Sequence, residues 1–206
     1  MQNVIIEPHY LGSLEFFTVL SQSDTILFEV NQHFTKQSFK NRCYMLTSEG
    51  VQPLTVPVSF DNRTAYKDVT IDNDQSWVRD HWGAFYSAYG KAPFFEYFQD
   101  HFQAIWEKPH KYLLDLNMEM MTMCLKVLQY DRRISFTKTY EKEGENGFID
   151  LREQIHPKKS FEHRKIYLPF SYTHTFGNIF VPNLSIIDLI LCEGSRASEV
   201  LTRSAI

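Results

Sequence analysis

The sequence predicts an α/β fold, in which a mostly parallel sheet begins with a βαβ unit and a helical block packs on it. Two observations predict this fold. Within about thirty residues, an apolar run at 4–6, a helical repeat over 11–20 and a β-branched run at 25–30 follow one another, which is typical of a parallel strand pair. The segment at about 74–129 then shows helical periodicity almost throughout.

The composition is that of a globular chain, and we expect a single domain spanning residues 1–206. Hydrophobic residues make up 43% and charged residues 22%, which excludes a disordered or fibrous chain. The formal charge of −4 is the opposite of the basic surplus of duplex-binding proteins, so we expect no nucleic-acid partner. No apolar run approaches the roughly 18 residues of a membrane helix, so we expect a chain that does not span a membrane.

Cysteine usage and the absence of known motifs narrow the chemistry. Cys43, Cys124 and Cys192 are widely spaced and odd in number, and the N-terminus lacks a signal-peptide pattern. We therefore expect a cytoplasmic protein with reduced thiols. The sequence has no P-loop, dinucleotide-binding or zinc motif, so we expect no cofactor and no metal.

The elements follow from local signals. The run at 4–6 is closed by Glu7–Pro8 and predicts a buried strand, while Leu11, Leu14, Phe17 and Leu20 have helical spacing. Residues 31–46 are mixed and basic, and predict a short helix or a loop. The later signals predict strands at 54–58, 67–72 and 134–137, and helices at 78–89, 95–105, 113–128 and 185–193. The charged segment at about 141–165 is expected to be a mobile surface loop.

Two groups near strand ends are candidates for a site. His9 follows the first strand, and ligands of open α/β sheets collect at the carboxyl ends of strands; the alternative is a loop histidine bonded to backbone. The second group is basic. If the segment at 33–42 is helical, His33, Lys36, Gln37 and Lys40 share one face, which suits a phosphate or carboxylate, or is simply a solvated basic face.

Three further residues have both a chemical and a structural interpretation. His81 lies at the edge of an apolar helical stripe, as a general acid or base or as an interfacial histidine. Ser185 forms an imaginable triad with Asp188 and His174, but Ser185-x-x-Asp188 before an apolar run is a helix N-cap pattern, which we favour. Cys43, beside a basic residue, is a weak candidate for a thiol of lowered pKa.

Several short stretches, taken in their order and spacing along nearly the whole chain, form a pattern that can be compared with known families. They are Pro8–Leu11, His33–Arg42, Gly50–Val58, His81–Trp82, Ala88–Phe95, Phe180–Leu189 and Glu193–Gly194. Together they resemble the WbqC-like protein family, and the chain, at 206 residues, resembles a short form of it. The longer relatives of this family carry an extra Gly/Tyr-bearing segment before the final strand, where this chain has only the charged segment at 141–165.

The resemblance implies a role in bacterial surface-polysaccharide (O-antigen-like) biosynthesis. It implies a transferase that moves glycine, or a similar aminoacyl group, to a nucleotide-linked or carrier-linked amino sugar, with another pathway enzyme as partner. The alternative is a non-catalytic sugar-nucleotide-binding or assembly protein of the same pathway. Convergence of a histidine with Asn41 and Arg42 in one pocket favours the enzyme, whereas scattered residues and an apolar surface patch favour the binding protein.

The enzyme hypothesis assigns a role to each candidate residue. His9 and His81 compete for the general base, because an attacking amine must lose a proton. The anionic part of the substrate is assigned to His33, Lys36, Lys40, Asn41 and Arg42, and the walls of the sugar or base pocket to Tyr10, Tyr89 and Phe94.

Overall fold

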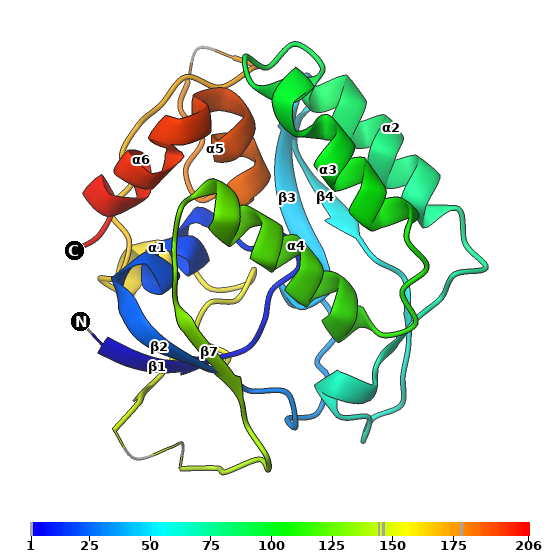
Figure 1. The fold of residues 1–206 in the computed structure, drawn as a ribbon, viewed down its shortest axis with the longest axis vertical. Helices are drawn as coiled ribbons and strands as arrows, with labels where there is room; N and C mark the ends of the chain where they lie inside the picture. Colours follow the sequence, from blue (N-terminus) through cyan, green and yellow to red (C-terminus); the bar gives the residue numbers. More distant parts are fainter. Residues whose placement is uncertain (1, 144, 146, 178) are drawn as a thin grey trace.

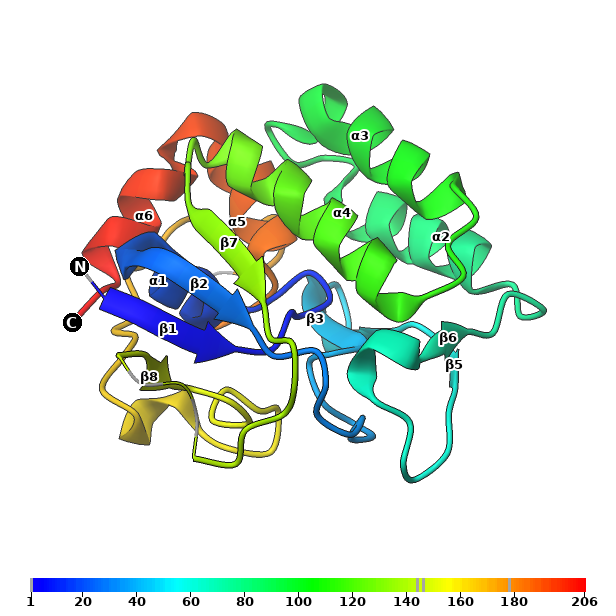
Figure 2. The same cartoon turned by 60° about the horizontal axis from the view of Figure 1, so that its bottom comes forward.

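The centre of the molecule is a four-stranded, fully parallel sheet with strand order β7-β2-β1-β8 (Figures 1 and 2). The computed structural model describes residues 2–143, 145, 147–177 and 179–206. The sheet and its first helix consist of β1 (Gln2–Ile6), α1 (Leu14–Gln22), β2 (Ser23–Phe28), β7 (Arg133–Phe136) and β8 (Ile149–Asp150). The predicted βαβ start and the α/β class are thus confirmed.

Burial explains why the chain opens with these elements. Val4, Ile5 and Ile6 of β1 are at most 2% exposed, as expected for a parallel strand covered on both faces. The side chain of Ser13 accepts a hydrogen bond from the Phe16 N–H and so begins α1. The helix α1 then contacts α5 (Ile186–Glu193) and α6 (Ala197–Arg203). In the C-terminal part of the chain, the 3₁₀ turn η2 (Phe161–His163) precedes α5, and the 3₁₀ turn η3 (Gly194–Arg196) lies between α5 and α6.

The helical block forms as predicted and is held by aromatic packing. It consists of α2 (Trp77–Tyr89), α3 (Phe95–Glu107) and α4 (Leu113–Val127). Phe85 is fully buried at its centre, with ring centroids 5.2 Å from those of Phe102 and Trp106. Much of the 15% aromatic content is therefore core. The block lies beside β3 and α5 (Figure 1).

The chain between the βαβ unit and the helical block differs from the expectation. Residues 31–41 form a loop, which is one of the two predicted alternatives, but residues 42–46 belong to a strand. They form an antiparallel hairpin of β3 (Arg42–Thr47) and β4 (Gly50–Thr55), in which Gly50 turns with a φ of 101°. The strand expected at 54–58 is divided, because β4 ends before Pro57 and the two-residue β5 follows. The strand expected at 67–72 is a 3₁₀ turn followed by a short strand. The short strand after β4 is β5 (Val58–Ser59). The 3₁₀ turn is η1 (Tyr66–Asp68), and the strand after it is β6 (Thr70–Ile71), which pairs with β5.

Two sequence expectations concern the surface of the molecule. The charged segment at 141–165 contains β8, which pairs with the edge of β1 through Val4 and Ile5. Within the residues described, no helix combines the length and the apolar character that crossing a membrane requires.

Candidate functional site

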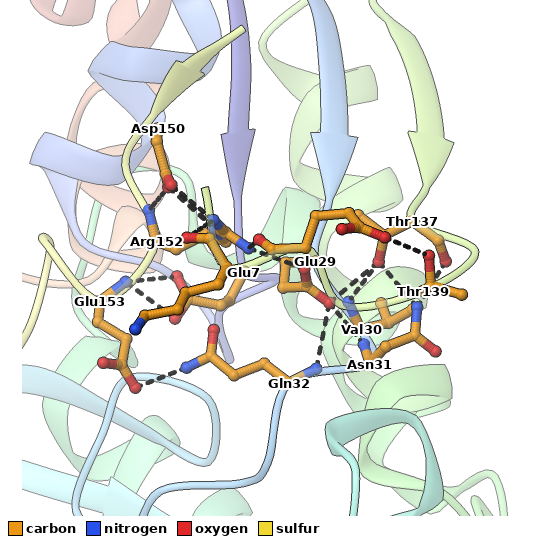
Figure 3. A network of polar contacts seen from close by, with 12 residues as sticks. Glu7, Glu29, Val30, Asn31, Gln32, Thr137, Thr139, Asp150, Arg152 and Glu153 are labelled. Carbon is orange, nitrogen blue, oxygen red and sulfur yellow. Dashed lines mark hydrogen bonds and ion pairs between the residues drawn. The ribbon is translucent and has the colours of Figure 1, made fainter. Parts of the chain in front are cut away.

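The carboxyl edge of the sheet gathers polar side chains from all four strands (Figure 3). Glu7 directly follows β1, Glu29 follows β2, Thr137 follows β7, and Arg152 lies two residues beyond β8. Ligands of open α/β sheets bind outside this edge. The edge is therefore the first place to look for a site.

Glu29 is the centre of this network. Its side chain is fully buried, and Oε1 accepts hydrogen bonds from the backbone N–H groups of Asn31 at 2.7 Å and Gln32 at 3.1 Å, and from the Thr137 hydroxyl at 3.0 Å. Its Oε2 lies 3.2 Å from Nη1 of Arg152. A single carboxylate thus fixes the loop after β2 to the segments after β7 and β8.

A second buried carboxylate, Glu7, continues the network. Both of its oxygens accept from the backbone N–H of Glu153 at 3.0 Å, and Oε1 lies 3.4 Å from Nζ of Lys40. The two side chains of this ion pair are 4% and 3% exposed. Arg152 is held on its other side by Asp150, with Nη2 2.6 Å from Oδ2. The charges at the sheet edge are therefore mostly paired with one another.

His9 lies beside this network as a neutral ring. It stacks on Phe16 with a centroid distance of 4.3 Å and tilts against Phe39 at 5.4 Å. Burial, aided by the charges of Lys40 and His156, lowers the pKa of His9 to about 3. Among the described residues its buried Nδ1 has no hydrogen-bond partner, which is rare in folded proteins and marks a candidate ligand contact.

A basic cavity of about 360 Å³ adjoins His9 through Phe39. Its walls include Phe39, Tyr44, His156, Lys158, Lys159 and Ser160. Arg164 also lines the cavity, but Glu15 binds its guanidinium with two contacts of 2.6 Å. No described residue lining this cavity is acidic, so its charge favours an anionic ligand.

The sequence analysis missed His156, Lys158, Lys159 and Ser160 as site residues. They lie in the charged segment that we expected to be a surface loop. The available signal was the run His156–Ser160 itself, which combines donors and cations in five positions. The location of this run near the sheet depends on the pairing of β8 with β1, which places the segment that follows β8.

Tyr10 and His81 lie together in a different environment, inside the helical block. The Trp106 indole N–H donates to the Tyr10 hydroxyl at 2.7 Å, and that hydroxyl donates to Nδ1 of His81 at 2.9 Å. The Nε2 of His81 donates to the Thr55 carbonyl at 3.2 Å. Burial lowers the pKa of His81 to about 4, so the ring is neutral and both of its nitrogens are engaged.

Tyr89 belongs to a third cluster, around Asp188. The Tyr89 hydroxyl donates to Oδ2 of Asp188 at 3.0 Å, and Tyr172 donates to Oδ1 at 2.8 Å. Nδ1 of His174 also binds Oδ1 at 2.8 Å, while its Nε2 accepts from the Val181 N–H. Asp188 is fully buried, and burial together with this carboxylate raises the pKa of Tyr89 well above its usual value.

Ser185 serves as the N-cap of α5, as predicted. Its side chain accepts from the Ile187 N–H and donates to the Leu11 carbonyl at 2.6 Å. Since Nε2 of His174 accepts from a backbone N–H, the three residues do not form the imagined triad. The expectation for Cys43 is wrong, because burial raises the pKa of this thiol to about 12.

The remaining predicted site residues are not among the described residues that line the cavity. Asn41 donates from Nδ2 to the Val56 carbonyl, and its Oδ1 is buried without a partner. Arg42 donates from Nε to the Thr55 hydroxyl. His33 and Lys36 are exposed, with the Lys36 ammonium 5.3 Å from the Phe60 ring centre, and Phe94 packs against Gly194.

The structure thus brings His9 and Lys40 together at the sheet edge, while His33 and His81 occupy two other environments. For a metal ion, the described part of the chain offers no group of three or more His, Cys, Asp and Glu side chains.

Comparison with known proteins gives the family. The chain matches the WbqC-like protein family over residues 7–165. It is also 27% identical over 139 residues to "Uncharacterized protein Rv1507c" of Mycobacterium tuberculosis (strain ATCC 25618 / H37Rv), an alignment that covers 66% of this chain and 60% of that protein. No solved structure matches the chain. The match at 7–165 includes Glu7, Glu29, Lys40, His81 and the cavity-lining residues His156–Arg164, and the chain belongs to the WbqC-like protein family.

Proposed function

We propose that this chain is an enzyme of bacterial surface-polysaccharide (O-antigen-like) biosynthesis. It binds a nucleotide-linked or carrier-linked amino sugar and transfers a glycine-type aminoacyl group to the amine. The observation that carries the proposal is the basic cavity beside His9 at the carboxyl edge of the sheet. Membership of the WbqC-like family also supports the proposed role in surface-polysaccharide biosynthesis.

The cavity suits a phosphate-bearing sugar in size and chemistry. Its volume of about 360 Å³ is within the usual range for small-molecule sites. Lys158 and Lys159 supply charge-assisted hydrogen bonds to phosphate, while Phe39 and Tyr44 provide aromatic walls for a sugar ring.

His9 is the candidate base for the transfer. The attacking amine must lose a proton, and His9 is neutral and can accept one. A pKa of about 3, caused mainly by burial, makes the free ring a weak base, but the negative charge of a phosphate in the adjoining cavity raises that pKa. Catalysis would then depend on the bound substrate.

The alternative is a non-catalytic sugar-nucleotide-binding protein of the same pathway. Two observations favour it. His9 and His81 are both buried and have lowered pKa values of about 3 and about 4, so neither is matched to proton transfer near neutral pH in the free protein. In addition, neither the basic cavity nor the pocket at His81 has Asn41 or Arg42 among its described lining residues, so the expected convergence of a histidine with these two residues is not seen. In this alternative the cavity holds the same ligand without chemistry.

The first test measures binding of UDP-glucosamine by calorimetry, with inorganic phosphate and free glucosamine as comparison ligands. Replacing Lys158 and Lys159 with Gln should weaken UDP-glucosamine binding by at least about a hundred-fold, since each charge-assisted hydrogen bond is worth about 1.5–3 kcal/mol and two are lost. The matched control replaces two exposed lysines elsewhere, Lys126 and Lys138, with Gln and should bind normally. Equal binding by both double variants would refute the cavity assignment.

The second test asks whether binding leads to chemistry. Mass spectrometry of UDP-glucosamine, incubated with the protein and an activated glycine, should detect the aminoacylated sugar. His9→Gln should bind the ligand and abolish the product. Binding that the lysine variant loses, without any product from the wild type, would instead select the binding protein.

A further inference from the structure

A second, larger groove of about 920 Å³ lies along α2. Figure 1 shows this helix at the outer edge of the helical block. It lies between α2 and the segment that contains Thr175 and Phe176, and it shares no lining residue with the basic cavity. The groove is therefore a separate feature that the proposed function does not use.

Gly83 is the unexplained residue of this groove. It lies inside α2, where glycine stabilises a helix less than alanine does. A Cβ added at Gly83 would meet nothing within 4 Å, whereas at Gly12 and Gly194 it would come within 2.5 Å of an aromatic ring. Packing thus requires the latter two glycines but not Gly83. What the missing side chain does provide is open space in the groove.

Two aromatic rings adjoin that space. Trp82 is half-buried and Tyr86 is 58% exposed, and their ring centroids are 6.4 Å apart. The apolar C–H face of a pyranose stacks on such rings, and its hydroxyls pair with hydroxyl side chains. Ser87 and Thr175 supply hydroxyl groups in the lining.

The charge of the lining limits the ligand further. Among the described residues of the groove, Lys91 carries the single formal charge, and its side chain is exposed at the C-terminal end of α2. A ligand that complements it carries a negative group at one end of its ring. We propose that the groove along α2 binds an acidic sugar, with the pyranose ring against Trp82 and Tyr86 over Gly83 and its carboxylate at Lys91.

The test measures the affinity of the full-length protein for digalacturonate by ligand-observed NMR, with neutral α-1,4-galactobiose at the same ionic strength for comparison. Gly83→Ala should weaken digalacturonate binding at least tenfold because the new methyl group occupies the space over Gly83 in which the pyranose ring lies. The same variant should raise Tm, since it improves helix propensity without a clash, so lost binding cannot come from misfolding. Tyr97→Ala is the control, because Tyr97 is 72% exposed on α3 outside the groove, and it should bind normally.

Lys91→Met should reduce the affinity for digalacturonate to that for galactobiose. Undiminished binding by Gly83→Ala, or equal wild-type affinity for the acidic and the neutral sugar, would overturn the proposal. So would the absence of binding by either sugar, which would leave an apolar partner surface as the alternative for this groove. Because the basic cavity could also bind an anionic sugar, the measurements are made in the variant with Lys158 and Lys159 replaced by Gln, which should keep digalacturonate binding in the groove, so the outcomes are distinguishable from those of the proposed function.

Discussion

Lowering the pH from 7 to 5 should destabilise the fold by about 4 kcal/mol, because two buried histidines resist protonation in the native state. Burial, with the charges of Lys40 and His156, lowers the pKa of His9 to about 3, and burial lowers that of His81 to about 4. An unfolded chain protonates both rings near pH 6.5. Below that pH the unfolded state binds more protons than the native state, so stability is lost as the pH falls.

The size of the effect follows from the two pKa values. One pH unit between the ambient pH and the pKa of the unfolded histidine is worth about 1.36 kcal/mol while the native ring stays neutral. At pH 5 the difference is about 1.5 units, which gives about 2 kcal/mol for His9 and nearly the same for His81. The contribution of His81 is fully lost near pH 4, and that of His9 near pH 3.

The assay is denaturant unfolding at pH 7 and pH 5. His9→Phe keeps an aromatic ring between Phe16 and Phe39 but binds no proton, so its loss of stability between the two pH values should be about half that of the wild type. His33→Gln, which replaces an exposed histidine, is the control and should lose as much as the wild type. A wild-type-sized loss in His9→Phe would refute the assignment of a buried neutral ring.

Two other substitutions test the buried polar networks. Tyr10→Phe removes the hydroxyl that serves both Trp106 and His81, and should destabilise the fold by about 2–4 kcal/mol because a buried donor and a buried acceptor lose their partner; urea unfolding at pH 7 measures this. Glu29→Gln places an amide against a guanidinium and should cost about 2–4 kcal/mol in the same assay, whereas Glu49→Gln at an exposed turn should change stability by less than about 0.5 kcal/mol. A cost for Glu29→Gln as small as that for Glu49→Gln would show that the network adds nothing.

The parts of the fold that the sequence predicts are those with strong local signals. Val4–Ile6 is apolar without alternation, and α2 to α4 keep a 3.6-residue repeat over several turns, so their burial can be derived before any tertiary contact is known. The β8 strand has only two residues, Ile149 and Asp150, which is too short for any period. It exists because the edge of β1 offers unpaired backbone groups at Val4 and Ile5.

The candidate site divides in the same way. His9 could be placed from the sequence because a residue after a first buried strand falls at the carboxyl edge of the sheet. Glu29 could not, since a carboxylate after a strand is ordinarily solvated, and its burial requires Arg152, which is 123 residues away in the chain. The lowered pKa of His9 could not be predicted from the sequence either, because it depends on burial and on the charges of Lys40 and His156, which come from two other segments.

The buried ion pairs have a consequence for the chemistry of the cavity. Arg152 is bound by Glu29 and Asp150, and Arg164 is bound by Glu15, so both guanidinium charges are neutralised by side chains that position their loops. Such pairs add little net stability but specify one arrangement of the chain. Arg164 lines the cavity, whereas Arg152 is not among its described lining residues. Lys158 and Lys159 also line the cavity, and within the described structure neither forms an ion pair. Anion selectivity should therefore reside in the two lysines, while the arginines determine where the lysines lie.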